Sequence, residues 1–339
     1  MTKATIIGNT SWGNTLASII GNNGIEVSLW ARTPDKAKEI NKNARSYSST
    51  SNIAEALNKS ELILWVVPSQ RLRENVSLAS QYLKPSMLLI SAAKGLEIDT
   101  GKRMSQIIAE EIPSALEKQI CALSGPNLAK EIGRGLPAAA MIASQDIAAA
   151  ERVRDLINSP KFLLFPTSDI TGVELGGALK NIVALGAGMI DGLGLGDNAK
   201  AAFVTWSWEE VISLGVALGA QVETFYGLSG LGDFVATCIS NLSRNHHVGF
   251  ELARGRPLKE IIDSMSQVAE GIYTSKAIHK LIPKLRLEIP IINLIYRILF
   301  EKLTASEAFL DFDKLKVNAC NFKTQTQGNR ALGNLLANS

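Results

Sequence analysis

Seven short apolar runs alternate with amphipathic segments through the first half of the chain, and this alternation constrains the fold more than any other feature. The runs are Thr5–Ile7, Ile25–Trp30, Leu62–Val67, Met87–Ala92, Ile120–Leu123, Ala138–Ala143 and Phe162–Phe165. Continuous apolar runs of this length are typical of strands buried on both faces of a mostly parallel sheet. Between them lie helix-start signals such as Thr33-Pro34-Asp35, where a capping residue precedes a proline. The alternation predicts a doubly wound, Rossmann-like α/β fold.

The second half has a different rhythm, with long helical segments separated by glycine loops. These segments are Ile170–Met189, Asn198–Leu218, Ser243–Ala253, Leu258–Met265, Thr274–Leu281 and Ile291–Phe300. We therefore predict a dinucleotide-binding α/β domain over residues 1–169 and an all-helical substrate domain over residues 170–339, packed together without a linker. The polar tail after Asn321 is expected to be loose.

The composition narrows the class of protein. The 339 residues suffice for about two domains, and the net charge of +3 argues against a nucleic-acid-binding protein. No signal peptide precedes the first run and no charge-free apolar run of about 18 residues occurs, so we expect a cytoplasmic protein without a membrane span. The cysteines argue against a disulfide framework and a thiolate zinc site because they are scattered, at Cys121, Cys238 and Cys320.

The first apolar run leads directly into a glycine loop, Gly8-Asn9-Thr10-Ser11-Trp12-Gly13. A strand, a glycine turn and a helix start are what a dinucleotide pyrophosphate needs, because the helix N-terminus offers unpaired N–H groups and a positive dipole end. The pattern is imperfect, since Thr10 stands where G-x-G-x-x-G has its middle glycine. By itself the loop leaves a cofactor site and a chance match equally open.

The end of the second predicted strand bears on the choice of cofactor. NAD sites usually place an acidic residue there, on the ribose 2′-hydroxyl, whereas this chain has Arg32. A guanidinium can make paired hydrogen bonds to a 2′-phosphate, which favours NADPH while leaving NADH possible. The alternative is that Arg32 is an ordinary solvated residue before a helix cap. Asp35 is a possible acid for the ribose, but it lies in the first turn of the next helix, where a carboxylate suits the helix dipole.

Small residues recur every four positions in the first helix of the second half, at Gly172, Gly176, Ala184 and Gly188, with Lys180 in the same row. This face permits close approach of a flat ring or another backbone, and one amine projects from it. Each interior glycine costs about 1 kcal/mol relative to alanine, so the row needs a ligand or a packing reason. Tight helix packing with a lysine that extends to solvent is the alternative.

Six further motifs occur in order along the chain. They are Ala93-Lys94-Gly95-Leu96-Glu97, Leu123-Ser124-Gly125-Pro126-Asn127, Gly176-Gly177-Ala178-Leu179-Lys180-Asn181, Gly186-Ala187-Gly188-Met189, Gly230-Leu231-Gly232-Asp233 and Ser243-Arg244-Asn245. Together they resemble those of the soluble bacterial NAD(P)-dependent glycerol-3-phosphate dehydrogenases. The resemblance implies a homodimeric oxidoreductase that reversibly reduces dihydroxyacetone phosphate, a small phosphorylated triose, to sn-glycerol 3-phosphate for phospholipid biosynthesis.

The resemblance also implies catalytic roles. Lys180 matches the lysine that supplies the proton, and its enclosure beside a nicotinamide would lower its pKa to about 7–8. Lys94 matches a second lysine whose charge would favour the oxyanion and help to lower that pKa. Asp233 matches a substrate-site acid expected to orient a lysine ammonium or a substrate hydroxyl, although a turn aspartate after glycine is common.

The remaining site residues are carried over in the same way. Arg244 with Ser243 and Asn245 would clamp the substrate phosphate at a helix start, whereas an isolated Ser-Arg-Asn is more often a helix cap. Gly125 and Asn127 would line the substrate pocket. The implied cofactor contacts are Gly8, Ser11, Trp12, Gly13, Arg32, Lys94, Ala129, Arg244, Val268 and Glu270.

Some positions depart from the family's pattern or suggest other functions. Besides Thr10, Trp206 stands where many members have arginine, and Asn127 where most bacterial members have threonine. His246 and His247 lack metal-ligand spacing and are expected to be solvated or at the phosphate edge, with no metal site. A related 3-hydroxyacid or 6-phosphogluconate-type dehydrogenase and a non-catalytic NADP sensor are the alternative functions. The two lysines together with the phosphate clamp argue against both.

Overall fold

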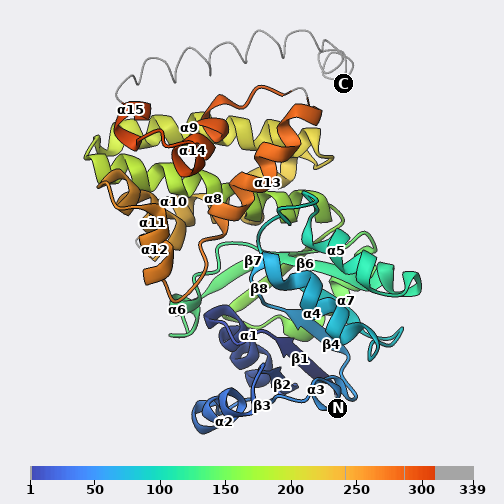
Figure 1. The fold of residues 1–339 in the computed structure, drawn as a ribbon. Helices are drawn as coiled ribbons and strands as arrows, with labels where there is room; N and C mark the ends of the chain where they lie inside the picture. The colour runs from blue at the N-terminus through green and yellow to red at the C-terminus, as the bar shows by residue number, and fades with distance from the viewer. Residues whose placement is uncertain (1, 241, 286, 310–339) are drawn as a thin grey trace, which may run out of the picture.

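The computed structural model describes residues 2–240, 242–285 and 287–309. The tail after Asn321 and Cys320 lie outside the described residues. Figure 1 shows a sheet covered by helices as one lobe and a second, helical lobe stacked on it.

An eight-stranded sheet with the order β3-β2-β1-β4-β5-β6-β7-β8 forms the first lobe. Its strands are β1 (Lys3–Ile7), β2 (Glu26–Trp30), β3 (Ser48–Thr50), β4 (Leu62–Trp65), β5 (Leu88–Ser91), β6 (Ile120–Ser124), β7 (Ala138–Ala143) and β8 (Phe162–Thr167). All neighbouring strands are parallel except β6 and β7, so the predicted Rossmann-like sheet is confirmed. The strand order reverses between β1 and β4, which is where open α/β sheets bind ligands at their carboxyl ends.

Helices cover both faces of the sheet and bury a core on each. They are α1 (Ser11–Asn22), α2 (Pro34–Asn43), α3 (Ile53–Leu57), η1 (Ser69–Arg71), α4 (Leu72–Ser80), α5 (Met104–Glu111), η2 (Ser114–Gln119), α6 (Ala129–Ile132) and α7 (Ile147–Ile157). Leu16 of α1 and Val153 of α7 belong to one core, and Val76 of α4 and Ile107 of α5 to the other. The predicted start of α2 is present, because the Thr33 side chain caps the helix.

Two details of the sheet differ from the sequence prediction. Strand β3 was not predicted, because Ser48–Thr50 is short and polar, and it forms by pairing with β2. Burial on both faces is wrong for β8, where Leu163 and Phe165 are 42% and 48% exposed. The reason is that β8 is an edge strand with a solvent-facing side.

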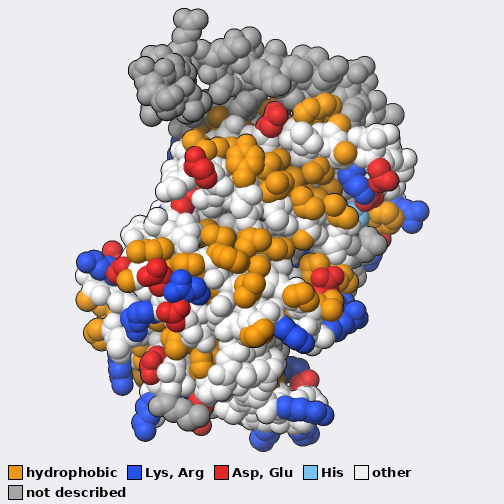
Figure 2. Space-filling model, turned by 180° about the vertical axis from the view of Figure 1, so that it is seen from behind, with side chains coloured by type: hydrophobic (Ala, Val, Ile, Leu, Met, Phe, Trp, Pro, Cys, Tyr) orange, Lys and Arg blue, Asp and Glu red, His pale blue; other side chains and the backbone are white. Residues whose placement is uncertain are grey.

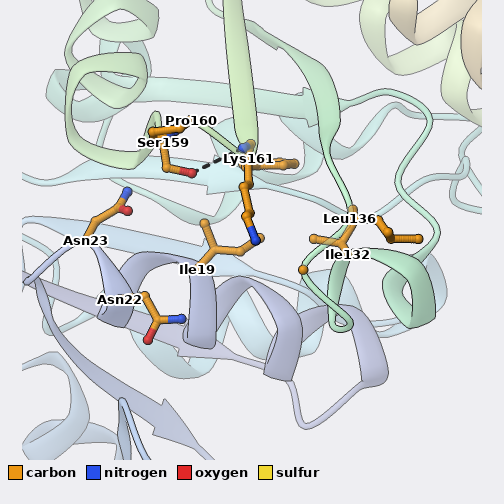
Figure 3. A pocket seen from close by; sticks show the side chains of 10 residues that line it. Ile19, Asn22, Asn23, Ile132, Leu136, Ser159, Pro160 and Lys161 are labelled. Carbon is orange, nitrogen blue, oxygen red and sulfur yellow. Dashed lines mark hydrogen bonds between the residues drawn. The ribbon is translucent and has the colours of Figure 1, made fainter.

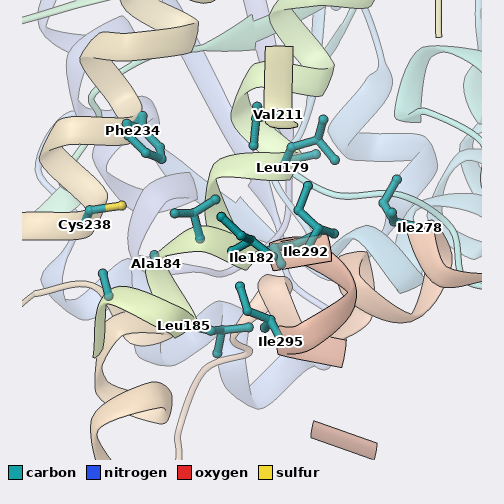
Figure 4. Close-up of a cluster of buried hydrophobic side chains, with 14 of the residues drawn as sticks. Leu179, Ile182, Ala184, Leu185, Val211, Phe234, Cys238, Ile278, Ile292 and Ile295 are labelled. Atoms are coloured by element: carbon teal, nitrogen blue, oxygen red, sulfur yellow. The ribbon is translucent and has the colours of Figure 1, made fainter. Parts of the chain in front are cut away.

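The second lobe is built around one central helix. Its elements are α8 (Ile170–Leu193), α9 (Gly196–Ala217), η3 (Val222–Tyr226), η4 (Leu228–Gly232), α10 (Asp233–Ile239), α11 (Arg244–Ala253), α12 (Leu258–Ser264), α13 (Glu270–Leu285), α14 (Pro290–Phe300) and α15 (Ala305–Phe309). Figure 4 shows Ile182 and Leu185 of α8 beside Ile292 and Ile295 of α14 in the helical core.

Helix α8 is apolar almost throughout, and 20 of its 24 residues are buried. By length and composition it is the one described helix that could cross a membrane. Its apolar window is wholly buried inside the protein, however, which is what the core helix of a globular domain shows.

Candidate active site

The small-residue row of α8 packs directly against neighbouring backbone. A Cβ on Gly176 would come within 2.7 Å of the Ser229 carbonyl oxygen, and one on Gly188 within 2.0 Å of that of His246. Close packing therefore accounts for these glycines. It does not account for Lys180, which is only 4% exposed and does not extend to solvent.

Three charged side chains form a cluster that we call the lysine centre: Lys180 and Asp233, which are buried, and Lys94, which is 19% exposed. Asp233, at the first turn of α10, accepts a hydrogen bond from Lys180 on one carboxylate oxygen and from Lys94 on the other, the latter at 2.7 Å. Lys94 Nζ also donates to the carbonyl oxygen of Gly125 at 2.8 Å. Lys180 Nζ donates to Thr237 Oγ1 at 2.6 Å. The two lysines come from different lobes and meet at one carboxylate.

Burial lowers the pKa of Lys180 to about 8, against the attraction of the Asp233 carboxylate. The positive charge of Lys94 lowers the same pKa further. Both the direction and the cause agree with the sequence prediction. A lysine with this pKa can exchange a proton near neutral pH, which an ordinary surface lysine does poorly.

Buried polar groups without partners among the described residues occur in the segment of Gly125, whose carbonyl accepts from Lys94. Both polar atoms of the Asn127 side chain and the Ser124 hydroxyl are buried and make no hydrogen bond within the described residues. A Cβ on Gly177 would lie 2.3 Å from Ser124 Oγ and 3.6 Å from Lys94 Cδ, so this part of α8 packs tightly against both. Buried polar atoms normally have partners, and unpaired ones at a cluster of lysines suit a polar ligand.

The three predicted clamp residues have different surroundings. Ser243 caps α11 by accepting from the His246 amide, as the helix-cap alternative expects. Asn245 is buried, donates to Asn181 Oδ1 at 2.8 Å and accepts from the Gly271 amide at 2.9 Å. Arg244 is exposed in the first turn of α11 and makes no hydrogen bond within the described part of the chain. Of the three, Arg244 is the one whose side chain makes no hydrogen bond to the described residues, which leaves its whole guanidinium for an anion.

The glycines of the dinucleotide loop (Gly8–Gly13) are required by its geometry. Gly8 has φ +132°, and a Cβ there would lie 2.4 Å from the Val66 carbonyl oxygen. A Cβ on Gly13 would lie 2.2 Å from the Gly8 carbonyl oxygen, so helix α1 can approach β1 this closely only with glycine.

Thr10 turns its side chain inward, beneath the loop. Its hydroxyl accepts from the Gly13 amide at 2.9 Å and donates to the Val66 carbonyl at 3.1 Å, so Thr10 caps α1 and ties it to the end of β4. The amides of Ser11 and Trp12, in the first turn, are left for an anion. The indole N–H of Trp12 is also buried and makes no hydrogen bond to the residues that the structure describes. The departure at Thr10 is therefore compatible with a dinucleotide site.

Other predicted cofactor contacts surround this loop. Arg32 follows β2 and forms an ion pair with Glu74, but both side chains are more than half exposed, so the pair is weak and Arg32 can turn to another anion. Ala129 begins α6, and its carbonyl accepts from Thr15 of α1 at 3.4 Å.

The segment that leads into α13, with the first residue of this helix, contacts the sheet lobe. Gln267, next to Val268, donates to Ser11 Oγ at 2.6 Å. Glu270 accepts from the amide of Ser69 at 2.9 Å and from its hydroxyl, and burial raises the pKa of this carboxyl. Predicted cofactor residues of both lobes thus lie at the carboxyl ends of β1 and β4.

Sequence reasoning missed Thr237, Ser124 and Gln267. Thr237 follows Asp233 by one helical turn, a signal that becomes readable only once α10 is known to begin at Asp233. Ser124 lies inside a quoted motif, but its unpaired state is a tertiary property. Gln267 directly precedes the predicted contact Val268, but its bond to Ser11 joins the two lobes and is likewise a tertiary property.

The expectation for the histidines is wrong at one position. His246 is buried and its Nε2 pairs with Asp191 at 2.7 Å, because α11 packs closely on α8, whereas His247 is exposed.

Burial raises the pKa of the Cys238 thiol to about 12. The described residues contain no group of three or more His, Cys, Asp or Glu that could hold a metal ion.

A cavity of about 350 Å³ lies elsewhere, at the far end of α1 from the dinucleotide loop. Figure 3 shows Ile19 and Asn22 of α1 on one side of it and Ser159, Pro160 and Lys161 on the other. None of the predicted site residues lines it, so it is not the candidate active site.

Comparisons with known proteins agree with the geometry. Residues 3–150 match the family model described as NAD-dependent glycerol-3-phosphate dehydrogenase N-terminus, and residues 169–310 match the corresponding C-terminus model. A glycerol-3-phosphate dehydrogenase [NAD(P)+] of Dehalococcoides mccartyi is 47% identical, with 91% of this chain and 89% of that protein covered. One from Citrifermentans bemidjiense is 40% identical, with 91% and 96% covered. The crystal structure of a Coxiella burnetii glycerol-3-phosphate dehydrogenase is similar with a TM-score of 0.86 and 30% identity, covering 91% of this chain and 98% of that one.

Proposed function

The chain belongs to the NAD-dependent glycerol-3-phosphate dehydrogenase family, and from this premise we propose which residues carry out its reaction. It is an oxidoreductase that reduces dihydroxyacetone phosphate to sn-glycerol 3-phosphate with NAD(P)H. The relatives do not favour the 3-hydroxyacid, 6-phosphogluconate-type or sensor alternatives.

Lys180 is the proposed proton donor to the ketone oxygen. The nicotinamide supplies the hydride to the carbonyl carbon when it is bound. As the carbonyl oxygen becomes an alkoxide, Lys180 Nζ transfers a proton to it, and in the reverse direction neutral Lys180 takes this proton back. Asp233 and Thr237 hold the amine in place, and the charge of Lys94 stabilises the developing oxyanion. The observation that supports this most is the buried Lys180 amine with its lowered pKa.

Arg244 is the proposed phosphate ligand, because it lies at the N-terminus of α11 and its guanidinium makes no hydrogen bond to the described part of the chain. Ser243 and Asn245 would position it rather than bind phosphate themselves, since their side chains bond to neighbouring protein groups. Asn127 and the backbone at Gly125 would hold the substrate hydroxyl beside Lys94.

For the cofactor we propose NADPH in preference to NADH, with the 2′-phosphate on Arg32. The amides of Ser11 and Trp12 would bind the pyrophosphate between Gly8 and Gly13. The other proposed cofactor contacts are Lys94, Ala129, Arg244, Val268 and Glu270.

We also propose a cytoplasmic homodimer with its two domains divided at residues 169 and 170. Asp169 caps α8 directly after β8, which supports that boundary.

The proposed dimer is supported by large exposed apolar side chains, including Phe165 of β8 and Ile239 of α10. Figure 2 shows apolar side chains gathered across the back face of the molecule. Light scattering of the purified protein would give its mass, and a monomer would contradict the dimer.

The activity is tested by following the absorbance of NADPH, and separately of NADH, after dihydroxyacetone phosphate is added to the purified protein. Oxidation of the cofactor is expected, with NADPH giving the lower KM. If neither cofactor is oxidised, the proposed function is wrong.

A further inference from the structure

Glu174 forms a further buried contact between the lobes, separate from the lysine centre and from the contact of Glu270 with Ser69. It lies on α8 about 9 Å before Lys180 along the helix axis. Its Oε1 accepts from the Ser105 amide at 2.7 Å, and its Oε2 accepts from Ser105 Oγ at 2.6 Å and from Arg103 Nη1 at 2.5 Å. We call Glu174, Arg103 and Ser105 the clasp. All three bonds that Glu174 accepts join the helical lobe to the sheet lobe, and Arg103 Nη1 also donates to Ser105 Oγ at 2.9 Å.

The clasp binds the segment that follows Lys94 in the chain. After Lys94 the chain forms a short hairpin, in which Leu96 and Arg103 are bridged and the Glu97 amide bonds to the Lys102 carbonyl at 3.0 Å. Arg103 and Ser105 lie where this hairpin ends and α5 begins. A carboxylate at the N-terminus of α5 is favoured by the helix dipole, and its bond to Arg103 is charge-assisted.

We propose that Glu174 is a positioning residue for the reaction, because its clasp fixes the Lys94 segment to α8 and thereby sets how the two lysines meet at Asp233. The inference rests on the proposed roles of Lys180 and Lys94. Lys94 passes close to α8 at Gly177, so a small shift of the segment would break its 2.7 Å bond to Asp233. Misplacements of about 1 Å in active sites can cost a hundredfold in rate.

If Glu174 only stabilised the fold, its substitution would lower the melting temperature and leave kcat unchanged. The chain offers a matched control for that case. Glu210 of α9 is likewise buried and accepts from two backbone amides, those of Ile291 and Ile292, both at 2.9 Å. It caps α14 within the helical lobe and does not contact the lysine centre. Glu210→Gln should lower the melting temperature and leave kcat and its pH profile unchanged.

The test is Glu174→Gln, which keeps the shape but points an NH₂ group at the donors of the clasp. We expect kcat to fall about 10- to 100-fold. The Kd for NADPH, measured by fluorescence without substrate, should change much less than kcat, because Lys94 is only one of the proposed cofactor contacts. NMR of ε-¹³C-labelled lysine, assigned with Lys180→Arg, should show the pKa of Lys180 rising. Lys180 is faced by Asp233 and Cys238 of α10 and by Lys94, and only Lys94 is released by the variant.

Unchanged kcat and an unchanged Lys180 titration in Glu174→Gln, with a lower melting temperature as in Glu210→Gln, would overturn the proposal. If Glu174→Gln does not fold, Ser105→Ala removes the hydroxyl that bonds to Glu174. This variant should shift kcat and the Lys180 titration in the same directions, but less. No shift in either would also overturn the proposal. If the wild-type protein does not oxidise NAD(P)H, the proposed function is wrong instead. In that case the Lys180 titration in Glu174→Gln alone tests the role of the clasp.

Discussion

Two parts of the molecule serve one reaction but are assembled differently. The dinucleotide loop lies within six consecutive residues of one lobe and packs on Val66 of the same lobe, with Gly8 and Gly13 allowing close backbone approach and Thr10 capping the helix. The lysine centre draws Lys94 from one lobe and Lys180 and Asp233 from two helices of the other. A local motif can therefore tolerate a change such as Thr10, whereas the lysine centre depends on how the lobes are joined.

The largest expected effect is at the lysine centre. Lys180→Ala should lower kcat by about 10²–10⁴-fold, because it removes the proton donor. The Kd for NADPH should stay nearly unchanged, since the dinucleotide loop is built independently. Stopped-flow kinetics and fluorescence titration measure the two quantities. A variant with near-normal kcat would remove Lys180 from its proposed role, and a large loss of cofactor affinity would mean that the two parts are not independent.

The pH dependence should have opposite signs in the two directions. The pKa of Lys180 is lowered to about 8, and reduction needs its protonated form. The kcat for reduction should therefore fall about tenfold per pH unit above this value, while oxidation should rise with pH and level off there. Steady-state rates in both directions, at saturating substrates, check this. The same pH limb in both directions would point to a group other than Lys180.

The same contrast explains how much could be read from the sequence. The strands and the cap at Thr33 were predictable because apolar runs and capping residues act within a few positions. Strand β3 was missed because its three polar residues form a strand only by pairing with β2. The lowered pKa of Lys180 was anticipated through the family resemblance. Its partner Thr237 and the clasp of Glu174 were not, because these contacts join residues more than 50 positions apart.

A smaller effect is expected where the second strand meets the cofactor. Arg32→Ala should raise the KM for NADPH about tenfold, the value of one or two hydrogen bonds to a charged group, and leave the KM for NADH nearly unchanged. Its partner Glu74 supplies the control, because Glu74→Gln breaks the same surface ion pair without removing the guanidinium. Equal changes for both cofactors would remove the 2′-phosphate from Arg32.

The smallest effect is expected inside the loop, at Thr10. Thr10→Val keeps the volume but loses the bonds to the Gly13 amide and the Val66 carbonyl, so the free energy of unfolding should fall by about 1 kcal/mol. The freed Gly13 amide changes how the helix start meets a pyrophosphate, and the Kd for NADPH should therefore shift severalfold, with Thr10→Ser restoring it. Asp146→Ala removes the cap of α7 and should lower stability alone. If Thr10→Val leaves the Kd unchanged, as Asp146→Ala should, Thr10 holds the helix without shaping the cofactor site. The loop is then even more tolerant of substitution than the comparison with the lysine centre implies.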